Sequence, residues 1–137
     1  MTRVSPIEVS DHFHTVFASF DAKDVSTLAE FMTDDIQLRL GNAEMIRGKA
    51  AFVDAVNGFL SSIAGVRHEI LRVFTDGDAV VVEFDVHYTR RDTNLVTIPC
   101  CNVFRLRDGL IAEYRSYIDA TPSTRRCAPA SRGKVET

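Results

Sequence analysis

The sequence predicts an α+β fold in which N-terminal helices pack on one face of a curved, mostly antiparallel sheet. Apolar residues recur with a helical period in the first half of the 137-residue chain and alternate with polar residues in the second half. Turn signals separate the alternating segments, so neighbouring strands should pair as hairpins. We expect residues 1–122 to form one domain, followed by a polar, basic tail over residues 123–137.

The first helix should begin at Ser5 and Pro6. Ser5 can cap the helix, Pro6 fits its first turn, and Glu8 stands three residues after the cap, as a capping box requires. The apolar residues that follow share one helical face and are Val9, Phe13, Val16, Phe17 and Phe20. This face should pack against the sheet.

A second helix, a short strand and a third helix complete the first half of the chain. Asp24 should cap the second helix, and the pair Asp34-Asp35 should end it. Alternation over residues 36–40 indicates a strand, which Gly41-Asn42 terminates. The third helix should run from about Lys49 to Ile63.

Four longer strands should follow and form antiparallel hairpins. Asp76-Gly77 and Asp108-Gly109 are turn sequences between them. Pro99 lies inside the third of these strands and suggests an edge position or a bulge, because proline cannot donate a ladder hydrogen bond. The four strands are expected at Val66–Thr75, Ala79–Thr89, Leu95–Arg107 and Leu110–Asp119.

Strand alternation gives the last three strands a large apolar face that carries a few polar side chains. Those polar side chains are Tyr88, Asn102, Tyr114 and Ser116. An apolar space with a few convergent hydroxyl and amide groups is the usual form of a small-molecule site. The alternative is a filled core in which the same groups bond to the backbone.

The opposite face of these strands mixes charged and apolar residues. Glu83 and Asp85 should lie beside Arg105 and Arg115 on neighbouring strands, where opposite charges attract. Because apolar side chains stand among these charges, we interpret the face as the interface of a homodimer. An ordinary solvent-exposed sheet face is the alternative.

Composition and charge argue against several classes of function. The net charge is −3 and no basic stripe lies in the periodic part of the chain, so we expect no nucleic-acid partner. No window approaches about 18 uninterrupted apolar residues, and the N-terminus lacks the apolar core of a signal peptide, which favours a cytoplasmic protein without a membrane contact. Cys100, Cys101 and Cys127 have no metal-binding or redox spacing, so we expect neither a metal nor another cofactor.

A group that transfers protons near neutral pH would be either a carboxylate turned inward by a bulge at Pro99 or a histidine. Every carboxylate on the last three strands should face away from the apolar side of the sheet, which leaves histidine as the other candidate. His12 lies at the flank of the apolar face of the first helix. His68 lies near the start of the first long strand. The side of the sheet to which its side chain points is ambiguous, because apolar residues occur on both sides of that strand. His87 should face outward.

Four segments of the chain resemble the nuclear transport factor 2-like superfamily, with the SnoaL-like polyketide cyclases and ketosteroid isomerase relatives as the nearest branch. These segments are DAKDVSTLAEFMTDDIQLRLGN, MIRGKAAF, VVVEFDVHYTR and NVFRLRDGLIAEYRSYIDATP. The resemblance implies a cone, in which the sheet wraps the helices and leaves an apolar cavity, in a homodimer. The superfamily includes isomerases, cyclases, dehydratases, epoxide hydrolases and binding domains without chemistry.

The catalytic residues of these relatives are mostly absent at the matching positions. Leu40 stands where the steroid isomerases have a general-base carboxylate, and Val16 stands in place of their oxyanion-donating tyrosine. Their second oxyanion donor matches Asn102, whose amide can still donate a hydrogen bond. Ser116 stands where the epoxide hydrolases carry an aspartate. These departures argue against both specific reactions.

The leading hypothesis is a pocket protein that binds a small, apolar, oxygen-bearing molecule. The first alternative is a cofactor-independent enzyme of the cyclase, isomerase or dehydratase type, with Asn102 and Tyr114 as oxyanion donors. Its base would be His12 or His68. The second alternative is a dimerisation module with a closed cavity. The side chains expected to line the ligand are Val16, Phe20, Leu40, Val56, Phe84, Val86, Tyr88, Phe104, Ser116 and Ile118.

Overall fold

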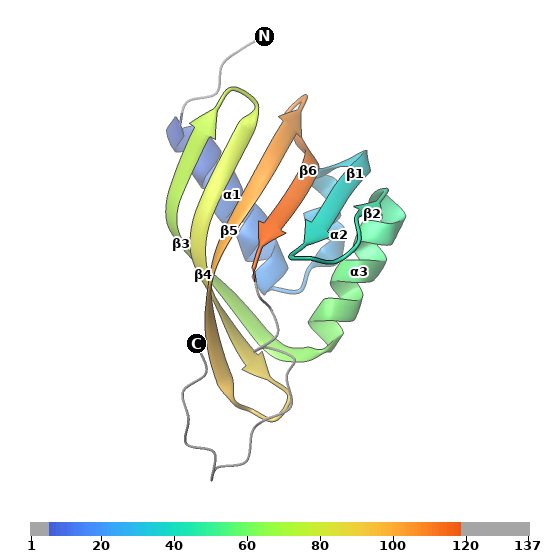
Figure 1. Ribbon diagram of the computed structural model, residues 1–137, viewed down its shortest axis with the longest axis vertical. Helices are drawn as coiled ribbons and strands as arrows, with labels where there is room; N and C mark the ends of the chain where they lie inside the picture. The colour runs from blue at the N-terminus through green and yellow to red at the C-terminus, as the bar shows by residue number, and fades with distance from the viewer. Residues whose placement is uncertain (1–5, 119–137) are drawn as a thin grey trace.

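In residues 6–118, which the structure describes, a six-stranded sheet curves around three helices (Figure 1). The structure is a computed structural model. Its helices are α1 (Pro6–Asp21), α2 (Val25–Glu30) and α3 (Lys49–Ser61), and its strands are β1 (Met32–Leu40), β2 (Ile46–Arg47), β3 (Ile63–Asp76), β4 (Ala79–Arg90), β5 (Leu95–Arg107) and β6 (Leu110–Tyr117). The expected α+β architecture is confirmed. The basic tail expected at residues 123–137 lies outside the described residues.

The strand order of the sheet is β2-β1-β6-β5-β4-β3. Strands β3 to β6 pair antiparallel in sequence order, as expected for consecutive hairpins, whereas β1 pairs parallel with β6. The parallel pairing places Leu38 opposite Tyr114 and Leu40 opposite Ser116. Figure 1 shows α1 behind β3, β4 and β5, and α3 beside β1 and β2. The curved inner face is therefore covered by helices at both ends of the sheet.

Helix α1 buries the apolar face that the sequence predicts. Phe13 and Phe17 are almost completely shielded from solvent. Their rings contact Phe104 and Phe84 on the sheet, at centroid distances of 4.6 and 4.9 Å. Aromatic pairs at such distances stabilise a core by more than the burial of their surface alone.

None of the helices in residues 6–118 is long and apolar enough to cross a membrane.

The strand after the second helix begins earlier than the sequence predicts. Asp24 caps α2 as expected, but β1 runs through Asp34-Asp35 instead of starting after them. The reason is that Met32 already pairs with Ile111 of β6, which commits this segment to the sheet. The register shifts after Met32, and both aspartates remain exposed. Pairing with a distant strand thus overrides the local helix signal.

The third helix also ends early, at Ser61, because Ile63 begins β3. The short strand β2 has no counterpart among the expected elements. It consists of two residues, and it forms because Ile46 pairs with Leu38 at the edge of the sheet. A strand of this length carries no periodicity that a sequence pattern could reveal.

Strand β3 contains an irregularity that decides which of its side chains face inward. The register with β4 shifts between Ile70 and Arg72. His68 and Ile70 are partly buried before the shift, whereas Leu71 and Phe74 are 49% and 52% exposed. A bulge of this kind reverses the alternation of a strand. As a result, His68 faces the helices together with its partner Val86, whereas Phe74, beyond the shift, faces solvent.

Pro99 lies in a strand that has a neighbour on each side. It pairs with β4 in regular register, and the register shift between β5 and β6 lies between Arg105 and Leu106. The expected bulge at Pro99 is therefore wrong. In the described residues β6 ends at Tyr117, which pairs with Cys101. The part of β5 before Cys101, which contains Pro99, therefore has no partner on β6 and is an edge on that side, which fits the other expectation for Pro99.

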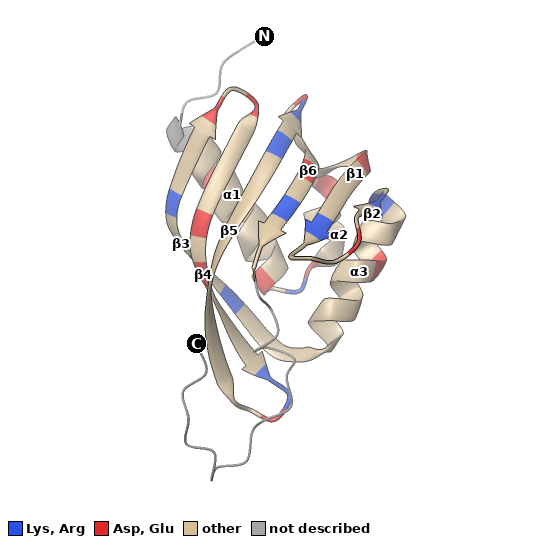
Figure 2. Cartoon of the chain, viewed as in Figure 1, with Lys and Arg blue, Asp and Glu red and all other residues tan. Residues whose placement is uncertain are grey.

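The outer face of the sheet carries charges of both signs (Figure 2), but their partners differ from the expected ones. Arg105 pairs with Asp78 at 3.4 Å, and Glu83 pairs with Arg72 of β3 at 3.6 Å. The register explains the difference, because Glu83 stands opposite Cys101 and not opposite Arg105. All of these side chains are substantially exposed, so each pair contributes little to stability.

Candidate functional site

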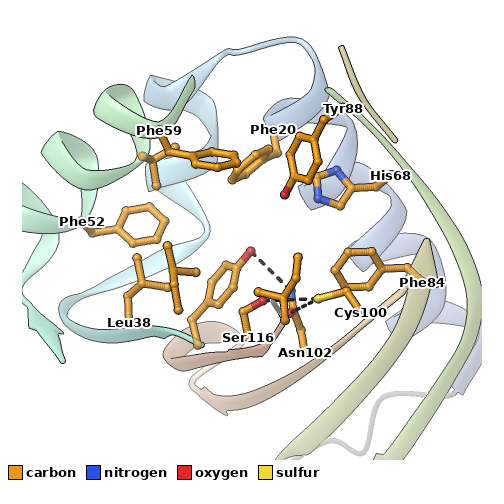
Figure 3. A pocket seen from close by; sticks show the side chains of 14 residues that line it. Phe20, Leu38, Phe52, Phe59, His68, Phe84, Tyr88, Cys100, Asn102 and Ser116 are labelled. Carbon is orange, nitrogen blue, oxygen red and sulfur yellow. Dashed lines mark hydrogen bonds between the residues drawn. The ribbon is translucent and has the colours of Figure 1, made fainter. Parts of the chain in front are cut away.

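A cavity of about 100 Å³ lies between the inner face of the sheet and helices α1 and α3 (Figure 3). One buried water needs roughly 10–15 Å³, so the cavity has room for a small organic molecule. Its wall is mainly apolar, and the polar atoms gather at two places. The lining consists of Phe20, Leu38, Leu40, Phe52, Val56, Phe59, His68, Phe84, Tyr88, Cys100, Asn102, Tyr114, Ser116 and Ile118.

The first polar place is formed by β5 and β6. The Asn102 amide donates a hydrogen bond to the Tyr114 hydroxyl oxygen at 3.4 Å. The Cys100 sulfur lies 3.4 Å from Asn102 Oδ1 and 3.4 Å from Ser116 Oγ. Cys100 and Asn102 are two residues apart on β5, and Tyr114 and Ser116 are two residues apart on β6. Side chains two residues apart on a strand share a face, so all four lie on the inner face of the sheet. Since Tyr114 accepts from Asn102, its own hydroxyl hydrogen remains available for a ligand.

Burial keeps the acidic groups of this wall protonated. It raises the pKa of the Cys100 thiol to about 11, and it raises the pKa values of the Tyr88 and Tyr114 hydroxyls well above their usual range. The cause in each case is desolvation, which disfavours the charged form. At neutral pH the wall therefore offers a thiol and two phenols as neutral hydrogen-bonding groups.

The second polar place joins β3 to the end of α1. His68 Nδ1 lies 2.5 Å from Asp21 Oδ1, and the backbone N–H of His68 donates to Asp21 Oδ2 at 2.9 Å. The imidazole packs against the rings of Phe17, Phe20 and Phe84, with centroid distances of 4.7, 5.1 and 5.1 Å. Only 6% of the His68 side chain is exposed. A carboxylate thus holds a buried imidazole in one orientation at the cavity wall.

Most of the side chains expected to line a ligand lie on the wall of this cavity. They are Phe20, Leu40, Val56, Phe84, Tyr88, Ser116 and Ile118, together with the expected catalytic residues His68, Asn102 and Tyr114. Val16, Val86 and Phe104 lie in the hydrophobic core and do not line the cavity. Phe104 contacts the rings of both Phe13 and Tyr114, so aromatic side chains fill the space at that end of the sheet.

The lining also includes residues that were not among the expected ones. They are Leu38, Phe52, Phe59 and Cys100. Periodicity could have found all of them, because Leu38 and Cys100 alternate with expected residues on their strands and both phenylalanines share the helical face of Val56. Asp21 had no such signal, because it stands 47 residues before His68 and no local pattern connects them.

His12, the other expected base, lies outside the cavity. Its ring packs against Phe13 and Phe31, at centroid distances of 5.5 and 5.3 Å. Burial lowers the pKa of this imidazole. Its Nε2 atom has no hydrogen-bond partner within the part of the chain that the structure describes. His12 therefore acts as a neutral aromatic side chain in the packing around α1.

A family model for the SnoaL-like domain matches residues 13–114, which is most of the chain. The chain belongs to the SnoaL-like domain family. No curated protein matches this SnoaL-like domain.

Solved structures similar to this SnoaL-like domain share its fold. An NTF2-like protein of unknown function from Burkholderia pseudomallei has 12% identity and a TM-score of 0.78, over 85% of this chain and 97% of that chain. An LEH-like epoxide hydrolase from M. tuberculosis has 22% identity and a TM-score of 0.70, over 81% and 82%. A protein with a ketosteroid isomerase-like fold from Catenulispora acidiphila has 15% identity and a TM-score of 0.72, over 78% and 84%. At these identities the likeness establishes the NTF2-like cone fold alone.

The wall of the cavity in this SnoaL-like domain carries no Asp, Glu, Lys or Arg side chain within residues 6–118. Leu40 and Ser116, at positions where the resemblance implies carboxylates in other members, both line it. Among the described lining groups, His68 is therefore the one imidazole, a side chain that carries a basic ring nitrogen in its neutral form. The same residues contain no cluster of three or more His, Cys, Asp or Glu side chains that could hold a metal ion.

Proposed function

We propose that this SnoaL-like domain binds a small, mainly apolar molecule that carries oxygen atoms, and that it does so in the cytoplasm. The observation that carries the proposal is an apolar cavity wall with polar groups at two separate places. Removing apolar surface from water supplies most of the binding free energy, while a few polar groups orient the ligand. The Tyr114 hydroxyl at one place and Tyr88 beside His68 at the other are groups to which ligand oxygens can bond.

The proposed ligand is uncharged. An ionised group that moved into this cavity would lose its hydration without gaining an opposite charge on the described wall. The penalty for burying an unpaired ion is several kcal/mol, which exceeds what a few hydrogen bonds to neutral groups return. Neutral ketones, phenols and enols meet this requirement.

Native mass spectrometry of the protein purified from its own host tests the proposal by searching for a retained small molecule. Ligand-observed NMR with phenol, cyclohexanone and benzoate tests the ligand class: the two neutral probes should bind and benzoate should not. Val56→Phe fills the cavity from α3, whereas Asn57→Phe adds the same side chain at an exposed position of that helix. Only Val56→Phe should abolish probe binding. Equal binding by both variants, or no binding by the wild type, would contradict the proposal.

We also propose that the outer face of the sheet binds a second copy of the chain. Leu71, Phe74 and Tyr117 are 49%, 52% and 60% exposed, and they line a groove of about 480 Å³ on that face. Contiguous apolar side chains exposed in this way mark interaction sites. The exposed pairs Arg72–Glu83 and Arg105–Asp78 present both signs of charge, which suits a two-fold interface in which each copy offers the same surface.

A further inference from the structure

His68 and Asp21 form a pair whose chemistry ligand binding alone does not use. The carboxylate makes two hydrogen bonds to one residue, at Nδ1 of the ring and at the backbone N–H. The backbone bond fixes the carboxylate, because His68 belongs to the edge strand β3, where its pairing with Val86 of β4 holds the backbone in place and its N–H points away from β4 to Asp21. Only 23% of the Asp21 side chain is exposed, so water competes weakly for it.

This geometry decides which ring nitrogen of His68 carries the hydrogen. A carboxylate can only accept hydrogen bonds, so Nδ1 of the neutral ring must be the donor and Nε2 must carry the free lone pair. Among residues 6–118, no group is hydrogen-bonded to Nε2. Figure 3 shows the ring at the cavity wall beside Tyr88. The lone pair of Nε2 is therefore available to a molecule in the cavity.

We infer that His68 is a general base for a neutral carbon or oxygen acid bound in the cavity, and that Asp21 is the positioning residue that keeps Nε2 unprotonated. This inference rests on the proposed binding function. In the step, a C–H or O–H bond of the ligand breaks, the proton moves to Nε2, and the electron pair stays on the ligand. The Asp21 carboxylate stabilises the imidazolium that forms. Return of the proton to another atom of the same molecule completes an isomerisation without a further reactant.

Negative charge that develops on a ligand oxygen in this step can be stabilised by the polar groups of β5 and β6, on the other side of the cavity from His68. Tyr114 accepts from Asn102, which leaves its hydroxyl hydrogen free to donate to that oxygen. A neutral donor that is already oriented in a dry wall stabilises a developing anion more than the same group would in water. The cavity wall thus carries a base, His68, and a separate hydrogen-bond donor, Tyr114.

Other titratable side chains lie around His68. They are Asp21 of α1, Lys23 after α1, Tyr88 of β4, Cys100 of β5 and Tyr114 of β6. Burial raises the pKa values of the thiol and of both phenols, so all three stay neutral below about pH 9. The ammonium of Lys23 is bonded to backbone carbonyls and not to the pair.

Nitrobenzisoxazole is a probe suited to this inference, because it is a small neutral ring that opens when a base removes one proton from carbon. The C–H bond and the N–O bond break, a nitrile forms, and a coloured cyanonitrophenolate is released. No other reactant is needed, so the reaction requires only a base in the cavity. Binding of the same compound is measured separately by ligand-observed NMR.

His68→Asn should lower kcat/KM for this probe by about 10²-fold, the low end of what a positioned base contributes. His87→Asn is the matched control, because His87 lies on the outer face, where it is bonded to Thr97 and Glu69. Its replacement should leave the rate unchanged.

Asp21→Asn tests the positioning role separately from the base itself. The single amide oxygen would accept from the fixed backbone N–H of His68, which turns the NH₂ group towards Nδ1. Nδ1 must then accept, so the ring hydrogen moves to Nε2 and the base is lost although the ring stays in place. ¹⁵N NMR of the imidazole should show hydrogen on Nδ1 in the wild type and on Nε2 in the variant.

A wild-type spectrum with hydrogen on Nε2 would overturn the inference without any variant, even if His68→Asn failed to fold. Binding of nitrobenzisoxazole with equal rates in the wild type and His68→Asn would also overturn it and would leave the binding proposal intact. Failure of the wild type to bind any neutral probe would instead refute the binding proposal, and this inference with it.

Discussion

The ammonium group of Lys23 lies 3.2 Å from the carbonyl oxygen of Leu60, and it also bonds to the carbonyl oxygens of Ile63 and Ala64. Leu60 is in the last turn of α3, where carbonyl groups lack partners within the helix and attract a cation. Lys23 reaches this point from the turn after α1, in a left-handed conformation with φ of 58°. One side chain therefore ties that turn to the junction of α3 and β3.

Lys23→Met should destabilise the protein by about 1 kcal/mol, because methionine keeps the unbranched side chain but cannot donate to the carbonyls. Urea unfolding near neutral pH measures the effect. Lys49→Met is the control, because the 3.4 Å pair of Lys49 with the fully exposed Asp34 should contribute little. An equal loss of stability in the two variants would contradict the role assigned to Lys23.

Asp24, at the N-cap of α2, should make stability depend on pH. Hydrogen bonds from Thr27 and Ser26 hold the pKa of this carboxyl below its usual range. The stabilisation is therefore present above the pKa of the unfolded chain and is lost as the pH falls through the lower pKa of the folded state. Asp24→Asn caps without ionising, so its Tm should fall less than that of the wild type between about pH 7 and about pH 3. An identical fall in both proteins would rule this out.

Tyr114→Phe should weaken binding of an oxygen-bearing probe more than binding of a hydrocarbon. The variant removes one hydroxyl from the cavity wall and keeps the ring. One hydrogen bond is worth about 1 kcal/mol, so the affinity for phenol should fall about five-fold while that for toluene stays nearly constant. NMR titrations measure both affinities. Equal weakening of the two probes would indicate a change of shape and not a lost hydrogen bond.

Arg105→Glu should shift the protein towards monomer in sedimentation velocity. The substitution breaks the pair with Asp78 and places an anion on the face proposed to meet a second copy. Arg47→Glu makes the same charge change at an exposed position of β2 and should leave the association state unchanged. A wild-type protein that remains monomeric at high concentration would refute the proposed dimer.

The fold could be predicted from the sequence because most elements keep their periodicity. All five alternating side chains from Val80 to Tyr88 are buried, since β4 lies inside the sheet with helices against one face. The cap at Asp24 likewise depends only on neighbours in the sequence. The boundary at Asp34-Asp35 was wrong because it depends on pairing with β6, far along the chain.

The candidate site could be predicted only in part, because its second polar place depends on two long-range features. His68 faces inward with its cross-strand partner Val86, and the register shift between Ile70 and Arg72 turns Phe74 to the other face, which alternation alone cannot reveal. The contact of His68 with Asp21 follows from the way α1 crosses the sheet. Asn102 and Tyr114, by contrast, belong to regular strands, and alternation places both on the inner face.

The parallel pairing of β1 with β6 sets an order for the assembly of the cavity. Leu38 and Leu40 form one part of its wall and Tyr114 and Ser116 another, and they meet only through this pairing. Closing so long a segment costs more conformational entropy than closing a hairpin. During synthesis β1 leaves the ribosome long before β6 exists. A nascent chain that stops short of β6 therefore lacks Tyr114 and Ser116 on the cavity wall, and the wall is complete only after β6 has been synthesised.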